Sequence, residues 1–260
     1  MYIRNKSVLI RVKKGFFSPL NMYKPRSYRQ WIKSDDLVSF EVKELETDLF
    51  ILAAKNLEPE AREAVLVHRS ELEKYIKTDP DFYSSLEPVA VPDEAPEIVR
   101  VMAEAGRKAG VGPMAAVAGA VAEFVGRELL NFSDEIIVEN GGDIFIRTKK
   151  KRLLGIYAGS RSPFTGKIAI EIGPDEKGLG VCTSSGTVSH SLSFGSSDAA
   201  LVISPEAALA DAAATAAGNI VKDDADLIKA IDFVKSIEGV KGVMIIIGGK
   251  MGSWGDVKLV

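Results

Sequence analysis

The sequence predicts an α/β or α+β fold, in which a mixed sheet flanked by helices forms a single domain. Short apolar runs bounded by Gly, Asn and Asp recur between residues 135 and 204, and this spacing is typical of strands. Stretches with helical apolar spacing precede and follow these runs. The chain of 260 residues, 46% hydrophobic and 27% charged, is long enough to bury one large core. We expect residues 1–90 to be an N-terminal strand and helix part of the same fold, and residues 91–260 to form the core with the ligand cleft.

The N-terminal part begins with a strand predicted at Val8 to Val12. The stretch FFSPLNMYKPRSYRQW that follows, residues 16–31, mixes basic and aromatic side chains. Such a mixture either contacts a phosphate or an adenine or, more commonly, forms a surface loop whose aromatic rings pack on the core. A strand is predicted within LVSFEVKELETDLFILA, where the alternation is clearest from Val38 to Val42.

The next segment has helical spacing from Glu58 to Ile76. His68 falls on its apolar face, where we interpret it as a core histidine because no Cys or second His lies at metal-ligand spacing. Four prolines between Asp79 and Pro96 predict an extended connection.

Two helices are predicted at Pro96 to Lys108 and at Pro113 to Leu130, separated by Gly110, Val111 and Gly112. The second helix is rich in Ala and Gly, so another backbone can approach it closely. Its G-V-G-P start exposes free amides that could bind a phosphate, with Gly112 next to it.

A run of strands follows. We place them at 135–139, 144–148, 152–158, 167–172, 180–183 and 199–204, with a helix at 224–237 and closing strands in VKGVMIIIGG and DVKLV. The sequence Asn140-Gly141-Gly142-Asp143 between the first two strands is a strong hairpin signal.

The most informative helix is predicted at Pro205 to Ala217, with Ser204 as its cap and Gly218 as a left-handed stop. After Glu206 its polar side chains are Asp211 and Thr215, one turn apart in a helix otherwise of Ala and Leu. A helix apolar on all sides is buried. An unpaired buried carboxylate is costly, so Asp211 should meet a cation, a metal or a set of hydrogen-bond donors.

The segment from Thr183 to Gly195 is rich in Ser, Thr and Gly, and it carries His190. It predicts either an ordinary connection or a loop whose hydroxyls and amides face a ligand. Cys182 precedes it, and we interpret this lone cysteine as a small core residue, the alternative being a thiol near a site.

These residues together resemble the ApbE superfamily of flavin transferases. The resemblance rests on the T-S-x-G pattern of Thr183, Ser184 and Gly186, on His190, and on an A-D-A-x-x-T helix with Asp211 and Thr215. The NGGD turn is similar to that family's glycine pair, and the likeness covers roughly residues 110–221. It implies an ApbE-like, T-fold-related domain.

The resemblance also implies the site. Asp211 and Thr215 would bind Mg²⁺, and His190 and Ser184 would be the catalytic candidates. FAD or a related nucleotide would lie against the glycine-rich segments: Gly112, Asn140, Gly141, Gly142, Asp143, Thr183, Ser184, Ser185 and Gly186. The implied activity is a Mg²⁺-dependent phosphoryl or nucleotidyl transfer.

The chain departs from the transferases after His190, where SLSFG replaces their I-D-P-x-T-G run. It therefore resembles an uncharacterised ApbE-like branch of archaea and anaerobic bacteria, linked to sulfide assimilation and homocysteine formation. Two alternatives to a flavin-binding transferase stay open: an accessory protein of that sulfur metabolism without transferase activity, and a non-catalytic structural protein.

Composition argues against several other classes of protein function. A net charge of −3 and a pI near 5.6 argue against nucleic acid as the main partner. One cysteine fits a reducing cytosol, and no apolar run near 20 residues or signal peptide is visible, so we expect a cytoplasmic protein that does not enter the membrane. The expected partner is a small nucleotide-like molecule, with a homo-oligomer left open.

Overall fold

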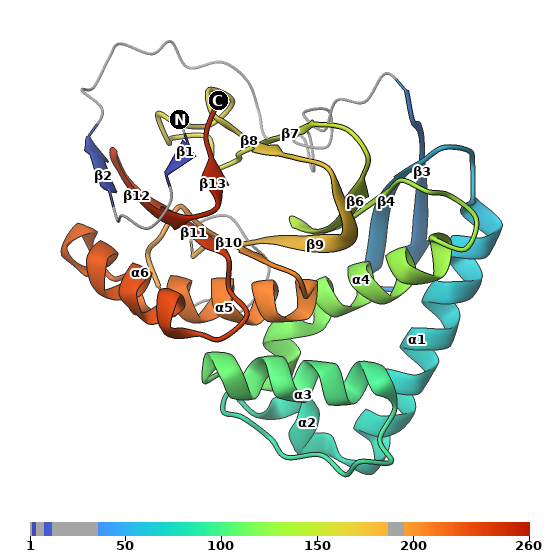
Figure 1. The fold of residues 1–260 in the computed structure, drawn as a ribbon. Coiled ribbons are helices and arrows are strands. Elements are labelled where there is room, and N and C mark those ends of the chain that lie inside the picture. The colour runs from blue at the N-terminus through green and yellow to red at the C-terminus, as the bar shows by residue number, and fades with distance from the viewer. Residues whose placement is uncertain (1, 4–7, 12–35, 187–194) are drawn as a thin grey trace.

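A computed structural model describes residues 2–3, 8–11, 36–186 and 195–260 (Figure 1). The basic and aromatic stretch at 23–31 and His190 lie outside the described residues. The α/β class predicted from the sequence is confirmed, since a large sheet carries helices on one side.

The sheet has the order β2-β12-β11-β10-β9-β6-β5-β4-β3, and every pairing among these strands is antiparallel. Its strands are β2 Val8–Arg11, β3 Val38–Glu44, β4 Thr47–Ala53, β5 Ile136–Asn140, β6 Asp143–Thr148, β9 Asp175–Ser184, β10 Ala199–Ser204, β11 Gly242–Ile247 and β12 Lys250–Gly255. Two smaller pairs are β7 Arg152–Gly155 with β8 Ala169–Ile172, and β1 Tyr2–Ile3 with β13 Val257–Lys258.

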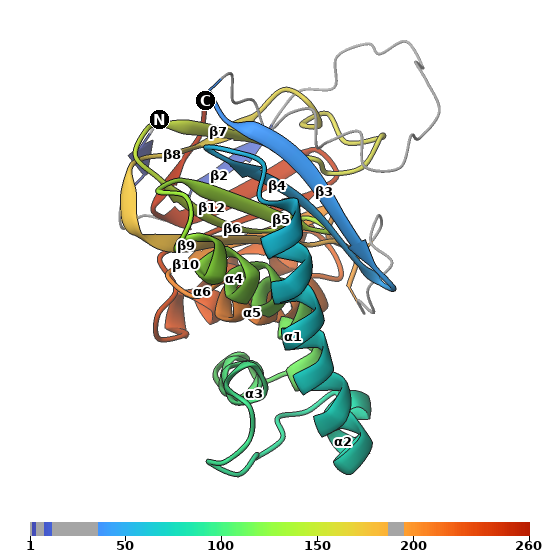
Figure 2. The same cartoon turned by 90° about the vertical axis from the view of Figure 1, so that its right-hand side faces the viewer.

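The helices all lie on one side of this sheet, as Figures 1 and 2 both show, and the two between residues 80 and 109 pack mainly on the other helices. The helices are α1 Glu58–Thr78, α2 Pro80–Ser84, α3 Glu97–Ala109, η2 Pro113–Ala116, α4 Val117–Leu129, α5 Ala207–Ile220, η3 Asp224–Asp226 and α6 Leu227–Ser236. Their apolar side chains form the larger core cluster with the inner face of the sheet. The opposite face is covered by the β7–β8 pair and by Phe164, which build a second apolar cluster.

Three local expectations needed correction. The single strand expected in residues 37–53 is a hairpin, because Leu45 adopts a positive φ of 51° and turns the chain between β3 and β4. The connection from Asp79 to Pro96 begins with the short helix α2. The helix expected at Pro113 begins with the 3-10 turn η2, so α4 starts at Val117.

The alanine-rich helix α5 also differs at its ends. It starts at Ala207, since Ser204 Oγ accepts from the Glu206 amide (3.2 Å) and holds the chain in a turn before the helix. It continues to Ile220, and Gly218 lies inside it rather than in a left-handed stop. His68 has the core position expected of it: it is buried in α1 and packs edge-on against Phe124, with ring centroids 5.1 Å apart.

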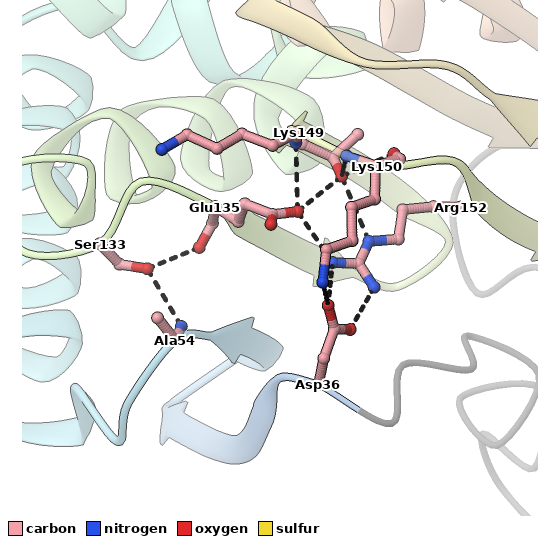
Figure 3. Close-up of polar contacts among 8 residues, drawn as sticks. Asp36, Ala54, Ser133, Glu135, Lys149, Lys150 and Arg152 are labelled. Atoms are coloured by element: carbon pink, nitrogen blue, oxygen red, sulfur yellow. Dashed lines mark hydrogen bonds and ion pairs between the residues drawn. The ribbon is translucent and has the colours of Figure 1, made fainter.

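A clamp of ion pairs joins the start of β3 to β7 (Figure 3). Arg152 is buried, and its guanidinium donates to Asp36 (2.6 Å) and to Glu135 (2.8 Å). Lys150 reaches the same Asp36 at 2.5 Å, and Lys149 reaches Asp134 at 2.7 Å. The basic run at 149–152 is therefore neutralised within the fold and does not form a free cationic patch.

Within the described parts of the chain, no single helix is long and apolar enough to cross a membrane. Only the bent pair of Glu97–Ala109 and Pro113–Leu129, at 104° to each other, reaches that length and composition together.

Candidate functional site

Asp211 lies where two helices meet. It is almost fully buried, with 8% exposure, because its neighbours along α5 are buried Ala and Leu side chains. Its Oδ2 atom accepts a hydrogen bond from the Gly119 amide (2.9 Å), and the Ala118 amide also stabilises its charge. A buried carboxylate needs hydrogen-bond donors, and for Asp211 these are backbone amides in the first turn of α4.

The same junction holds a second buried carboxylate, that of Glu123 on α4. Its Oε2 atom accepts from the Ala207 amide (2.7 Å) and the Ala208 amide (3.3 Å), which are the first two residues of α5. Its other oxygen pairs with Arg127. In Figure 1, α4 and α5 run away from each other from this contact, so two helix N-termini meet here.

The NGGD turn lies beside this junction. Gly141 (φ 69°) and Gly142 (φ 110°) close the two-residue hairpin between β5 and β6, so the hairpin interpretation holds. Asn140 Nδ2 donates to the Ala118 carbonyl (3.1 Å), and the Thr183 amide donates to Asp143 Oδ1 (3.1 Å). The turn is thereby tied both to α4 and to the end of β9.

Asp143 and Asp211 form a buried acidic pair. Burial raises the pKa of Asp211 to about 7, against the lowering effect of the Gly119 and Ala118 amides. The pKa of Asp143 is raised well above its ordinary value, first by burial and then by the charge on Asp211. Among the described residues, no lysine or arginine pairs with either carboxylate. Burial thus favours the protonated forms of both carboxyl groups, and neither has a cationic partner in the part of the chain that the structure describes.

Cys182 is a buried neighbour of this pair. Its Sγ atom donates to the Ala207 carbonyl (3.3 Å), and burial followed by the charges of Asp143 and Asp211 raises the pKa of the thiol well above its ordinary value. The thiol is protonated at neutral pH, which confirms the interpretation of Cys182 as a core residue.

The Ser/Thr-rich segment is described at both of its ends. Ser184 and Ser185 are buried, and the Gly186 amide donates to the Ser197 carbonyl (3.0 Å). A Cβ on Gly186 would lie 2.1 Å from the Gly195 carbonyl oxygen, and one on Gly195 would lie 1.7 Å from the Gly218 carbonyl oxygen. The two ends of the segment are therefore in contact and rest on the C-terminal part of α5.

Two predicted ligand contacts have other neighbours in the fold. A Cβ on Gly112 would lie 1.9 Å from the Ser85 carbonyl oxygen, so its small size is explained by packing. The Gly142 amide donates to Glu139 Oε1 (2.8 Å). Thr215 is half-buried, one turn after Asp211 on the same helix. Ligand binding by Gly112 and Gly142 and metal binding by Thr215 stay predictions.

The residues that sequence reasoning missed are Glu123 and the amides of Ala118 and Gly119. The signal for Glu123 was available, because a lone acid in the apolar run MAAVAGAVAEFVG requires a buried partner for the same reason as Asp211 does. The side chains of Ala118 and Gly119 give no sign that their backbone amides bind a carboxylate.

Comparison with known proteins shows the family and the fold of this chain. A family model described as "AbpE bacteria" matches residues 29–252. The chain belongs to this ApbE-like family. Its relatives include a UPF0280 protein of Methanocella arvoryzae, 47% identical over 81% of this chain and 85% of the relative, and one of Methanosarcina acetivorans, 44% identical over 76% and 78%.

Solved structures with the ApbE-like fold have low sequence identity to this chain. The apo flavinyl transferase ApbE of Pseudomonas stutzeri superposes with a TM-score of 0.55 at 12% identity, covering 84% of this chain and 94% of that one. The ApbE protein of Thermotoga maritima gives 0.50 at 15% identity, covering 85% and 96%. The resemblance seen in the sequence motifs is thus confirmed for family and fold.

Proposed function

We propose that this ApbE-like protein binds FAD or a related flavin nucleotide together with Mg²⁺ where α4, α5 and the NGGD turn meet. The observation that carries the proposal is the buried pair of Asp143 and Asp211, which has no cationic partner among the described residues. The flavin transferases that share the fold give the ligand class.

The donor set suits magnesium that is shared with a ligand. Among the described residues, no group of three His, Cys, Asp or Glu side chains could hold a metal ion alone. Mg²⁺ commonly binds one or two carboxylates, waters and the phosphates of a substrate. Asp211 would hold the ion with the hydroxyl of Thr215 in support. When bound, the ion would neutralise charge on the phosphate oxygens.

The chain's own groups would orient the nucleotide. A Cβ on Gly141 would have no heavy atom within 4 Å, so a ligand can approach this backbone. The amides of Gly142 and Thr183 already have carboxylate acceptors, so they hold the turn in shape rather than cradle the ligand. Ser184 would contact the ligand from the end of β9, and His190 remains the proposed acid or base for phosphoryl or nucleotidyl transfer.

A second candidate function is binding without transfer, as in an accessory protein of sulfur assimilation. The SLSFG sequence after His190 favours it, because the transferases' I-D-P run is missing while Asp211 and Thr215 are kept. Positioning errors of about 1 Å cost on the order of a hundredfold in rate, so loss of that run should impair transfer more than binding.

The experiment is FAD binding, followed by quenching of flavin fluorescence, with Mg²⁺ and with EDTA. Wild-type protein should bind FAD more tightly with Mg²⁺, and Asp211→Asn should lose this difference while the exposed Asp232→Asn keeps it. Equal affinity in all conditions would reject the metal site. Incubation with FAD, Mg²⁺ and a threonine acceptor peptide, followed by mass, then separates transfer from binding.

A further inference from the structure

The helices α4 and α5 both begin without a cap of their own. The residue before α4 is Ala116 and the residue before α5 is Glu206, and neither side chain caps its helix. Neither helix has an acidic residue in its first turn. Since Ala207 and Ala208 are fully buried, water does not reach the free amides at the start of α5.

Each helix instead receives a carboxylate from the other. Glu123 on α4 accepts from the first amides of α5, and Asp211 on α5 accepts from the Gly119 amide of α4. Gly119 and Glu123 are four residues apart, and so are Ala207 and Asp211, so both bonds lie on the facing sides of the two helices. The carboxylates also offset the like partial charges of the two N-termini.

Apart from these two hydrogen-bonded carboxylates, the packing of α5 on α4 does little to fix the position of α5 along α4. Its buried surface is almost entirely alanine, which offers no large side chain to interlock with a neighbour. The backbones approach closely: a Cβ on Gly119 would lie 2.3 Å from the Ala207 carbonyl oxygen, and one on Gly180 would lie 2.3 Å from the Ala207 Cα. The two carboxylate bonds are therefore the directional contacts that set the register of α5 along α4.

We infer that Glu123 is a positioning residue: by binding the start of α5 it holds the Asp211 carboxylate on the Gly119 amide, in the position from which Asp211 would bind a cation. This inference rests on the proposed function for its cation, and on the two carboxylate bonds for its geometry. A partner that orients a metal ligand contributes about 10- to 100-fold to metal affinity.

Two conservative variants of Glu123 separate the effect of side-chain length from the effect of its charge. Glu123→Gln keeps an oxygen at the same distance from Ala207, whereas Glu123→Asp keeps the charge but withdraws it by one C–C bond, about 1.5 Å, which breaks the hydrogen bond. The first readout needs no ligand: the ¹H–¹⁵N signal of Gly119 in glycine-labelled protein. It should move in Glu123→Asp and stay near its wild-type position in Glu123→Gln, with the exposed Glu128→Asp as control.

A further variant guards against misfolding. Glu123→Met combined with Arg127→Met removes both members of the ion pair, so no buried charge is left unpaired, and such replacements commonly preserve folds. It too should move the Gly119 signal, while Arg127→Met alone should not. An unmoved Gly119 signal in both Glu123→Asp and the double variant, or equal movement in Glu123→Gln, would overturn the inference.

The second readout is the ratio of FAD affinities with and without Mg²⁺. Glu123→Asp should lower this ratio about 10- to 100-fold and leave affinity in EDTA unchanged, a split that general loosening of the fold does not produce. A wild-type protein with no Mg²⁺ effect would reject the proposed function, while the Gly119 signal still decides the geometry. A wild-type Mg²⁺ effect that Glu123→Asp retains in full would reject the positioning role alone.

Discussion

Replacing Asp211 by Asn should stabilise the metal-free protein, and by more as the pH rises. The folded state raises the pKa of Asp211 from 3.8 to about 7, so between these values it keeps a proton that the unfolded chain has lost. The free energy of unfolding therefore falls as the pH rises through this window and levels off above about pH 7. At about 1.4 kcal/mol for each pH unit, the total effect is on the order of 4 kcal/mol.

Asn keeps the shape of the side chain and can still accept from the Gly119 amide, but it never ionises. The two proteins should thus differ little near pH 4, and the variant should be more stable by about 4 kcal/mol near pH 8. The difference should grow further where Asp143 ionises more readily in the variant, because the charge on Asp211 that raises the pKa of Asp143 is gone.

The assay is urea unfolding of both proteins in EDTA at several values between about pH 5 and pH 8. Mg²⁺ with FAD should then restore the stability of the wild type at high pH and have no such effect on the variant, because a ligand stabilises only the state that binds it. A difference in stability that does not change with pH, or a variant less stable than wild type near pH 8, would refute the reasoning.

Three further outcomes are expected. Arg152→Met should lower the free energy of unfolding by about 3 kcal/mol in urea titrations, because it leaves the largely buried Glu135 without its cation and Asp36 with Lys150 alone; a loss below about 1 kcal/mol would contradict a stabilising role for these ion pairs. Gly119→Ala should cost about 2 kcal/mol, since its Cβ would lie 2.3 Å from the Ala207 carbonyl oxygen, whereas Gly173→Ala, with open space around it, should be nearly neutral in the same thermal melts. Cys182 should react with a thiol reagent only when the protein unfolds, and labelling of the native protein as fast as that of a free thiol would argue against its burial.

The predictable parts of this fold are those fixed by local chemistry. The burial of Asp211 followed from the alanine helix around it, and the NGGD turn followed from two glycines that can adopt positive φ. The hairpin at Leu45 did not follow, because the turn contains no Gly, Asn or Pro.

The rest depends on contacts between distant segments. Gly218 has the residue type of a helix stop, yet the helix continues and its carbonyl oxygen contacts Gly195. The donors for Asp211 are the amides of Ala118 and Gly119, and their availability depends on where the 3-10 turn gives way to α4. A single sequence does not show which backbone amides are free to donate. The partner of a buried acid can therefore be predicted as a cation, a metal or a hydrogen-bond donor, but not as a particular residue.

Gly186 and Gly195 are in contact, so the sequence between them could be replaced without moving its two ends apart. Because residues 186 and 195 lie against each other, a different sequence or length placed between them should change the entropy of chain closure only slightly. The transferases' I-D-P-x-T-G run could therefore be grafted between these two glycines. In such a chimera the segment after His190 would be the one part of the chain that is changed, so any gain in transfer could be assigned to it.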